Sequence, residues 1–547
     1  MRNIYRFESN FTRRIMNHFH KSSARWLALV IFSTHLLLPG GALGAQGDLD
    51  INFGFGGRVT TQLGAEDYIQ DIATLPDGRL IVVGFTGIAA DKFALVCYTA
   101  NGSFDPNFGQ GGVVTTQISE EDRAVAVAIQ GNKIIVLGYS FTSAEKRFFS
   151  LARYDANGNL DPTFGSNGIV TTNIPGNVNE TPADVAVNPE DGKIVVVGTT
   201  PGNESKAIAI RYLTDGNLDA SFGSGGVREI NYQPDDVDAS AVAIHNGKVI
   251  IGGRLKAKFW VTRLLQDGST DPSFNVSGYI TFSFPDSSSS RLNAIAVQAD
   301  GKIVVAGTAL HPNTLPDFAL ARISSSGFID SNFGNLGRVV TDFDGFDDNG
   351  QDVTLQANGK IIVVGRTSNP ANGTNSFGVV RYNQNGSLDQ GFQDGGKIRT
   401  PFNDAPTAEA VAVKHDGNIV VAGSFINPAS STHDFALVSY LTAEPTFDII
   451  IKNDATNRYL KINSLTGAYQ FSDCDKGVFA EGIGSMSVKS CKLNFVGGGQ
   501  NSSVSALVNP CTKQGNATVI VMMQGIPSSK TYQLNDTDIT NNPNGCF

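Results

Sequence analysis

Residues 160–168, LDPTFGSNG, recur with small changes at seven places in this chain. In every copy Asp stands at the second place, Phe at the fifth and Gly at the ninth. Consecutive copies begin between 52 and 59 residues apart. A repeat of this length indicates one structural unit that is used seven times. The copies begin at Leu49, Phe104, Leu160, Leu218, Thr270, Ile329 and Leu388.

The fixed residues of the repeat form three sets. The aspartates are Asp50, Asp105, Asp161, Asp219, Asp271, Asp330 and Asp389. The phenylalanines are Phe53, Phe108, Phe164, Phe222, Phe274, Phe333 and Phe392. An arginine precedes the motif in five copies: Arg153, Arg211, Arg263, Arg322 and Arg381. We expect each arginine to pair with the aspartate of its own loop. Seven equivalent sites seldom form one active site, so a structural role is favoured.

Between the motifs, every unit carries the same four apolar segments. A short β-branched segment such as IVTT (169–172) comes first, and an alternating run such as AVAVAI (124–129) comes second. An Asp-Gly or Asn-Gly turn leads into a solid apolar run, as in DGKIVVVG (191–198), and a segment such as FSLARY (149–154) completes the unit. Alternation, β-branched residues and Gly turns all indicate antiparallel strands.

Seven units of four strands predict an all-β fold, a seven-bladed β-propeller. The alternative is a linear β-solenoid, which needs distinct capping ends, whereas these copies are alike. The chain enters on a first-type segment at 58–61 and leaves the repeats at 435–440 without another. The last blade therefore lacks one strand, and we expect residues 58–61 to complete it. With the Ala-rich run innermost, this closure hides an exposed sheet edge.

The quoted stretch then connects the third and fourth strands of a blade. Asp161 can accept backbone N–H bonds from the turn that follows, and Pro162 fixes φ at the next position. We expect Phe164 to return the loop to the core and Gly168 to permit a tight approach before the next strand.

The combined motif resembles the delta-60 repeat family of bacterial propellers. The resemblance rests on FSLARYDANGNLDPTFGSNGIVTT (149–172) followed by DGKIVVVG, and it covers about residues 47–440. The copies that begin at Leu218 and Thr270 depart most from the pattern. The resemblance implies the propeller fold and no established common activity, so no functional residue is carried over from it.

The first 45 residues are typical of an export signal. Basic residues precede the apolar run WLALVIFSTHLLL (26–38), and small residues follow it in PGGALGAQ. Met16 would give a signal of more ordinary length. A run of 13 residues is too short for a membrane anchor, which needs roughly 20. We therefore expect a secreted, periplasmic or cell-surface protein without a transmembrane anchor after cleavage.

Removal of that segment leaves 35 basic and 50 acidic residues, a net charge of −15. An acidic protein gains nothing from counterion release at phosphates, so nucleic acid is not an expected partner. The expected partner is an unknown extracellular protein or glycan. The domain boundaries predicted are 1–45 for the signal, 46–441 for the propeller and 446–547 for a C-terminal domain.

The C-terminal segment is a different kind of sequence. It is predicted to form a small β-sandwich-like domain or a β-sheet module, and it holds four of the five cysteines. Four cysteines in an exported protein indicate two disulfides, with three possible connectivities. The pairs Cys474–Cys491 and Cys511–Cys546 are favoured. Cys97, which replaces the recurrent arginine in the first unit, is expected to be a buried free thiol.

No catalytic motif stands out, and we predict no catalytic, cofactor-binding or metal-binding residue. There is no GxSxG, HExxH, Walker A loop or GxGxxG. The run Asp155, Asn157, Asn159 and Asp161 places oxygens on alternate residues, as calcium loops do, but no bidentate Glu follows and a plain turn needs the same residues. Beyond residue 45 only four histidines remain: His245, His311, His415 and His433.

Three classes of function stay open. A non-enzymatic binding or scaffold protein is favoured over a propeller lyase or hydrolase acting on a saccharide, and a structural cell-surface component is the third. A ligand would meet the propeller at one end of its central channel. A histidine–carboxylate pair or several carboxylates converging in one pocket there would favour the enzyme.

Overall fold

The computed structural model describes the propeller nearly completely. Described are residues 45–442, with gaps at 65, 88–89, 142–145, 175–178, 203, 312–314, 346, 370–373 and 403–404, and the strand segments between 447 and 534. Contacts divide the chain into two compact units, of which one is Gly44–Ala443 and the other contains Glu444–Phe547. The predicted signal segment lies outside the described residues.

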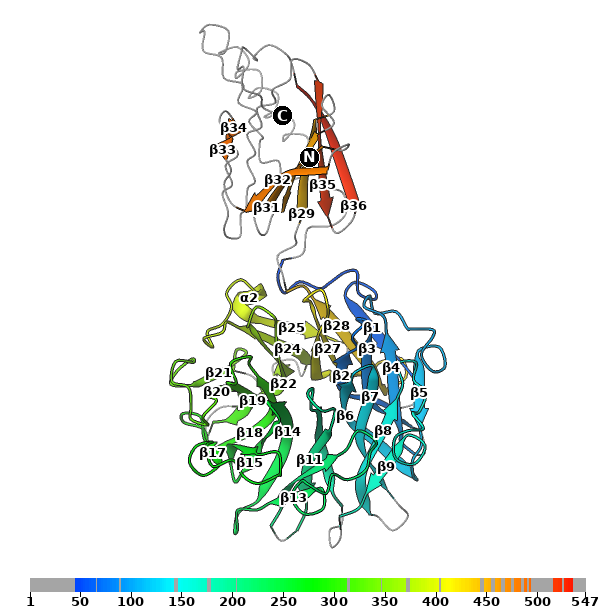
Figure 1. The fold of residues 1–547 in the computed structure, drawn as a ribbon, viewed down its shortest axis with the longest axis vertical. Helices are drawn as coiled ribbons and strands as arrows, with labels where there is room; N and C mark the ends of the chain where they lie inside the picture. Colours follow the sequence, from blue (N-terminus) through cyan, green and yellow to red (C-terminus); the bar gives the residue numbers. More distant parts are fainter. Residues whose placement is uncertain are drawn as a thin grey trace. The chain divides into compact units, whose positions relative to one another are not determined.

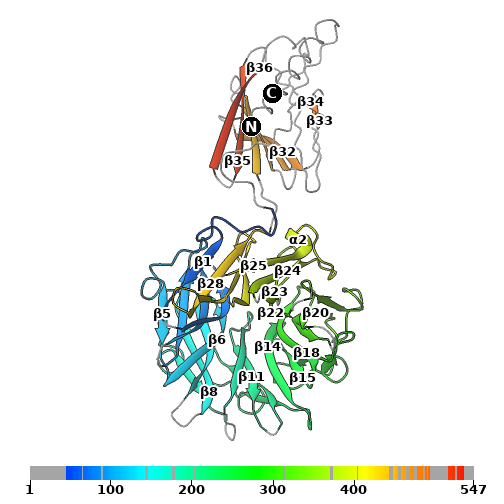
Figure 2. The ribbon, with the colours of Figure 1, turned by 180° about the vertical axis from the view of Figure 1, so that it is seen from behind.

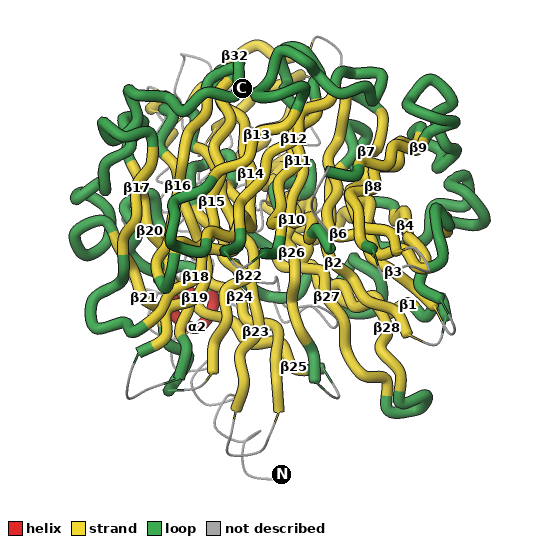
Figure 3. Tube along the Cα trace, turned by 90° about the horizontal axis from the view of Figure 1, so that it is seen from below, coloured by secondary structure: helices red, strands yellow, loops and turns green. Residues whose placement is uncertain are grey.

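The first unit is a seven-bladed β-propeller, as the repeat predicts. Each blade is a four-stranded antiparallel sheet, and the blades follow one another around the ring in chain order (Figure 1). Strands make up almost all of its regular structure, and the one helical segment described is the short α2 (Gln393–Gly396) (Figure 3). The repeat spacing therefore predicts both the fold and the number of blades.

The strand bounds repeat from blade to blade. Blades 1 and 2 consist of β2 (Glu66–Thr74), β3 (Leu80–Gly87), β4 (Lys92–Tyr98), β5 (Val113–Thr116), β6 (Glu121–Gln130), β7 (Lys133–Phe141), β8 (Arg147–Tyr154) and β9 (Ile169–Thr172). Blades 3 and 4 consist of β10 (Thr181–Val187), β11 (Ile194–Thr200), β12 (Lys206–Tyr212), β13 (Val227–Ile230), β14 (Val237–His245), β15 (Lys248–Leu255), β16 (Lys258–Leu264) and β17 (Tyr279–Phe282).

Blades 5 and 6 consist of β18 (Ser289–Val297), β19 (Ile303–Leu310), β20 (Asp317–Ile323), β21 (Arg338–Thr341), β22 (Asp347–Leu355), β23 (Ile361–Asn369), β24 (Thr374–Tyr382) and β25 (Lys397–Pro401). Blade 7 consists of β26 (Thr407–Val413), β27 (Ile419–Asn427), β28 (Thr432–Tyr440) and β1 (Arg58–Thr61). The first strands of neighbouring blades lie against one another around the axis (Figure 3).

The predicted closure of the ring is confirmed. Strand β1 pairs antiparallel with β28, from Arg58 opposite Val438 to Thr61 opposite Phe435. Figures 1 and 2 both place the blue β1 beside the gold β28. One apolar cluster joins the two ends of the repeat region, since Phe53 and Ile69 pack in it with Phe435 and Leu437. The N-terminal strand thus covers the edge that β28 would otherwise expose.

The connector motif has the predicted turn chemistry. Thr163 N–H donates to Asp161 Oδ1 over 3.1 Å, which closes an Asx-turn, and Phe164 is fully buried. Gly168 has a φ of +93°, and a Cβ there would lie 2.9 Å from the Cβ of Leu160. Only glycine fits that position at no steric cost.

The second unit is also built of strands. Its described strands form one six-stranded antiparallel sheet and one two-stranded sheet. The prediction of β structure for this segment is confirmed. The strands are β29 (Phe447–Asn453), β30 (Arg458–Asn463), β31 (Ala468–Asp473), β32 (Gly477–Ile483), β33 (Ser487–Val488), β34 (Cys491–Lys492), β35 (Gly515–Met523) and β36 (Ile526–Leu534). The side chains of all four predicted disulfide cysteines lie outside the described part of the chain.

Deletion of residues 46–62 tests the closure. The deletion removes β1 and the Phe53 plug, so the variant should lose several kcal/mol of stability and melt at a lower temperature. The control is a chain that begins at residue 46 and keeps β1, which should melt like the full protein. Equal melting temperatures for the two truncated chains would contradict the closed ring.

Candidate functional site

The predicted Arg and Asp residues meet on one face of the propeller, which we call the repeat face. It carries the connectors between third and fourth strands and the turns between first and second strands. In five blades the arginine Nε donates to the Asp Oδ2 of its own connector over 2.7 to 2.9 Å. Its guanidinium lies 4.2 to 4.7 Å from the centre of the connector's Phe ring. We call this set the Arg–Asp–Phe clamp.

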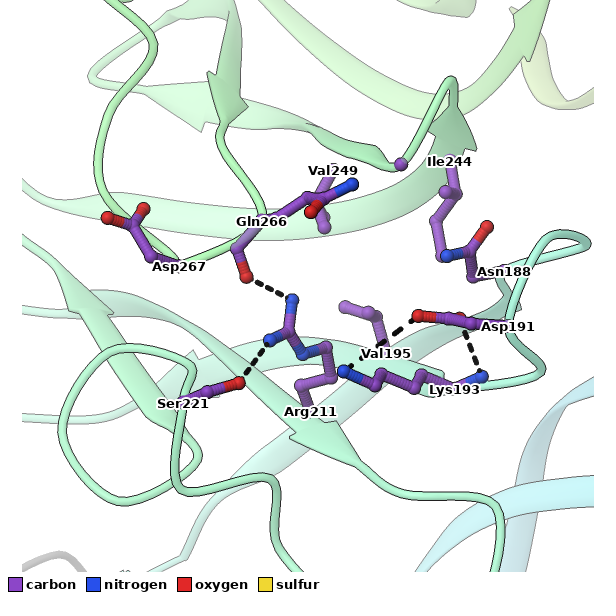
Figure 4. Close-up of a pocket in the computed structure, with 11 residues that line it drawn as sticks. Asn188, Asp191, Lys193, Val195, Arg211, Ser221, Ile244, Val249, Gln266 and Asp267 are labelled. Atoms are coloured by element: carbon purple, nitrogen blue, oxygen red, sulfur yellow. Dashed lines mark hydrogen bonds and ion pairs between the residues drawn. The ribbon is translucent and has the colours of Figure 1, made fainter.

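The clamp also reaches the next blade. Figure 4 shows Arg211 donating to the carbonyl oxygen of Gln266 in blade 4 and to Ser221 Oγ in its own connector. Lys193 lies 3.0 Å from Asp219, so two cations contact one carboxylate. Burial alone would raise the pKa of that carboxyl group, but Ser221, Lys193 and Arg211 hold it below its ordinary value. These residues satisfy one another around a cavity of about 220 Å³, which indicates a structural role.

In the two units without the recurrent arginine, a cation from another position pairs with the connector aspartate. In blade 1, Arg79 from the hairpin turn donates to Asp105 over 2.7 Å and to the carbonyl of Ala156 over 2.8 Å. In blade 7, Lys414 donates to Asp50 over 2.8 Å. Cys97 is buried and free, as expected, and burial raises the pKa of its thiol to about 12.

The central channel contains carboxylates that the sequence analysis overlooked. Asp71, Asp184 and Asp352 occupy the same place at a β-bulge in the first strands of blades 1, 3 and 6. The other four blades have alanine there, as expected near a crowded axis. The sequence does hold a signal, because an Asp interrupts the alternating run in IQDIAT, PADVAV and GQDVTL.

Each channel carboxylate joins two blades. Asp184 accepts the N–H of Val185 over 2.7 Å and the N–H of Val242 in blade 4 over 2.8 Å. Asp71 and Asp352 make the matching bonds to Val127 and Val411. Burial, and to a smaller extent repulsion from Asp352, raises the pKa of Asp184 to about 7, although the hydrogen bonds that Asp184 accepts lower it. Burial also raises the pKa of Asp352 to about 6.

A larger pocket opens on the opposite face, which we call the loop face because it carries the connections from fourth to first strands. Its volume is about 540 Å³, and blades 5, 6 and 7 line it. Asn293 Nδ2 donates to Gln351 Oε1 over 3.1 Å, and Arg366 pairs with Asp347 over 3.0 Å. Its lining includes Ser289, Ser290, Arg291, Asn293, Thr308, Leu310, Pro316, Asn349, Gln351, Arg366 and Thr407.

A histidine–carboxylate pair lies on the loop face where blades 7 and 1 meet. Glu66 Oε2 and Tyr68 Oη each lie 2.8 Å from His433 Nδ1. The hydrogen bond to His433 holds the pKa of Glu66 below its ordinary value, and burial raises the pKa of Tyr68. From the sequence, His433 is a candidate only by its residue type, since it lies 367 positions from Glu66.

Comparisons with known proteins agree with a repeat β-propeller. The family described as "Domain of unknown function (DUF5122) beta-propeller" matches residues 75–108, 132–164, 190–222, 298–333 and 356–392. Each match runs from a hairpin turn to the Phe of a connector. The unit that ends at Phe274 is not matched, in line with the departure noted from the copy at Thr270, whereas the unit that ends at Phe222 is matched although the copy at Leu218 also departs from the pattern. No curated protein matches the chain.

Several solved structures align with this chain at low similarity. The polysaccharide lyase Uly1 is 12% identical with a TM-score of 0.42, over 75% of this chain and 94% of that one. The BP39L lectin from Burkholderia pseudomallei is 11% identical with a TM-score of 0.42, over 68% and 96%. YCF48 from Cyanidioschyzon merolae is 11% identical with a TM-score of 0.39, over 70% and 99%. Likeness at this level does not bear on activity.

Loss of the clamp should destabilise the propeller. Arg381 is fully buried and contacts Asp389, Phe392 and the carbonyl of Thr442, so Arg381→Ala should cost about 3 kcal/mol in chemical denaturation. Arg381→Lys should cost less stability than Arg381→Ala but should still be destabilising, since an ammonium group cannot make all these contacts together. Arg254→Ala, which removes a half-exposed arginine paired with Asp238, is the control and should cost under about 1 kcal/mol. Equal costs for Arg381→Ala and Arg254→Ala would contradict the clamp.

The channel carboxylates predict a dependence of stability on pH. Their folded-state pKa values lie above the unfolded values near 4, so they contribute stability at low pH that is lost as pH rises through about 6 to 7. The double variant Asp184→Asn, Asp352→Asn should show a smaller fall in melting temperature between about pH 5 and pH 8. Asp215→Asn, at an exposed turn, should leave the fall unchanged. An unaltered slope in the double variant would show that the channel carboxylates do not titrate in this range.

Proposed function

We propose that this repeat β-propeller is an exported, non-enzymatic binding or scaffold protein of the delta-60 repeat type. Its ligand is an extracellular glycan or a segment of an extracellular protein. The ligand meets the loop face at the pocket lined by blades 5, 6 and 7. That pocket is the single observation that carries the proposal, and the leader-like N-terminal segment supports export.

The pocket has the size and chemistry for a polar ligand. Its volume of about 540 Å³ falls within the range usual for small-molecule sites. Arg291 is exposed, and Arg366, which pairs with Asp347, belongs to a lining that also holds amide and hydroxyl side chains. Guanidinium groups bind carboxylates through two parallel hydrogen bonds, and amides bind hydroxyl groups. A saccharide or peptide segment that carries a carboxylate fits this set best.

Binding is favoured over structure alone because the lining departs from the repeat. The position of Asn293, Gln351 and Glu409 at the bulge holds Gln70, Val125, Ala183 and Ser240 in the other blades. Amide and carboxylate side chains thus occupy this position in blades 5, 6, 7 and 1. Within blades 5 to 7, Asn293 donates to Gln351 and Gln351 donates to Glu409 over 3.4 Å. A repeat that only stabilised the ring would not need this difference.

One observation favours the second candidate, an enzyme that acts on a saccharide. A histidine with Nδ1 beside a carboxylate can use its other nitrogen as a general base, and the nearby Tyr68 remains protonated. The Glu66–His433 pair lies between blades 7 and 1, whereas the pocket of about 540 Å³ lies between blades 5 and 7. Binding therefore remains the primary proposal.

A glycan and peptide array with the purified protein tests the binding proposal. The expected result is retention of carboxylate-bearing ligands, and Arg366→Ala should weaken that binding at least tenfold, because a charge-assisted hydrogen bond contributes about 1.5 to 3 kcal/mol. The matched control is Arg254→Ala, at the equivalent register position in blade 4, near the bulge of that blade. Equal binding by the two variants would contradict the assignment of the pocket.

Assays of lyase and hydrolase activity on the retained ligands distinguish the enzyme from the binding protein. Turnover that disappears in His433→Ala while array binding persists would establish the enzyme in place of the binding protein. No turnover with wild-type protein would support binding alone.

A further inference from the structure

We propose that the loop face holds a calcium site between blades 5 and 6, made by Asp317, Asp342 and Asp348. One carboxylate oxygen from each residue lies within 4.8 Å of the other two, and this is the group with metal-ligand spacing among the described residues. Asp317 begins the third strand of blade 5, Asp342 follows its fourth strand, and Asp348 lies in the first strand of blade 6.

The decisive feature is an oxygen of Asp348 that lacks a partner. Asp348 is 0% exposed, and its Oδ2 accepts the N–H of Phe343 over 2.7 Å. Its Oδ1 is buried and has no hydrogen-bond partner among the described residues. An unpaired buried carboxylate oxygen is costly, and such groups normally coordinate a cation or meet a donor.

Two sister blades satisfy both carboxylate oxygens at this position, whereas in blade 3 the equivalent Glu180 accepts the N–H of Ile174 with Oε1 and leaves Oε2 without a partner among the described residues. Asp67 and Asp122 stand at the same place in blades 1 and 2 and are equally buried. Asp122 accepts the N–H of Ile118 with Oδ2 and the N–H of Ser119 with both oxygens. Asp67 accepts from Leu63, Gly64 and Thr86 with its two oxygens. In both blades the loop satisfies the whole carboxylate.

Blade 6 differs because its loop is one residue longer. Seven positions separate Thr341 from Asp348, against six between Thr61 and Asp67. The extra residue changes the partners of the loop: Gly345 N–H donates to Asp342 Oδ1 over 2.5 Å, and Asp344 pairs with Arg399 over 2.9 Å. The loop therefore brings a second carboxylate, Asp342, toward Asp348 where the sister loops bring backbone donors.

Asp317 completes the set. The equivalent place holds Lys92, Lys206 and Lys258 in blades 1, 3 and 4, and an aspartate, Asp434, in blade 7. Asp317 is buried, and His311 Nε2 lies 3.8 Å from its Oδ2. Burial and the neighbouring carboxylates raise the pKa of Asp348 to about 8 and that of Asp317 to about 6, as expected where negative charges crowd together.

The donor chemistry selects the cation. Three carboxylates are hard oxygen ligands, which suit calcium, magnesium and manganese rather than zinc or copper. Calcium accepts six to eight oxygens in an adaptable geometry, so water or a bound ligand can complete the shell beside the exposed Asp342. Magnesium needs near-ideal octahedral geometry, which three carboxylates from two blades do not impose.

The test is a calcium titration of the chelator-treated protein by calorimetry and by thermal melting. We expect one site, and a rise in melting temperature of about 3 °C at a hundredfold excess of calcium over its dissociation constant. Asp348→Asn should abolish both the heat and the shift. Without metal, Asp348→Asn should melt no lower than wild type, because the substitution removes a carboxyl group that Asp317 and Asp342 crowd, so loss of binding is distinguishable from misfolding.

Asp122→Asn is the matched control at the same position in blade 2. It should melt lower than wild type, since it weakens a satisfied network, and it should keep the calcium response. Three outcomes would overturn the proposal: no heat or shift in wild type up to about 10 mM calcium, above the weakest extracellular sites, an undiminished response in Asp348→Asn, or tighter binding of magnesium than of calcium.

Discussion

A four-stranded sheet in this protein has two apolar faces, and it can bury both only between two similar sheets. The middle strands of each blade are buried along nearly their whole length, with runs such as Ile134–Leu137 at 0% exposure. Seven apolar clusters fill the spaces between successive blades. An open row of blades would expose two such faces, so the ring must close. The borrowed strand β1 and the Phe53 plug satisfy this constraint.

Polar interactions then fix how each blade meets the next. On the repeat face the Arg–Asp–Phe clamp reaches a carbonyl of the following blade, and near the axis Asp71, Asp184 and Asp352 each accept an N–H from the following blade. Both devices are directional, whereas apolar packing is not. They therefore set the register between sheets that the apolar clusters hold together.

The two faces of the ring consequently differ in what they can do. The repeat face is occupied by seven copies of one connector, whose charged groups satisfy one another. The loop face varies: it holds the polar pocket of blades 5 to 7, the Glu66–His433 pair and the three aspartates between blades 5 and 6. Functional differences can accumulate there without disturbing the clamp. Among the residues that the structure describes, none forms a helix with the length and apolar character of a membrane span.

The sequence by itself determined the strands, the turns, the number of blades and the closure. These follow from local patterns: alternation, Asp-Gly turns, the spacing of LDxxFGxxG, and one first-type segment placed before the repeats instead of after them. It also indicated the partners within a clamp, because Arg153 and Asp161 belong to adjacent elements of one chain segment.

Only the tertiary structure decided which residues from different blades meet. Glu66 and His433 come from opposite ends of the repeat region, and Asp342 meets Asp348 where a loop is one residue longer than in blades 1 and 2. Such meetings depend on sheet register, loop length and the angle between blades. Each is a property of the closed ring and leaves no periodic trace in the sequence.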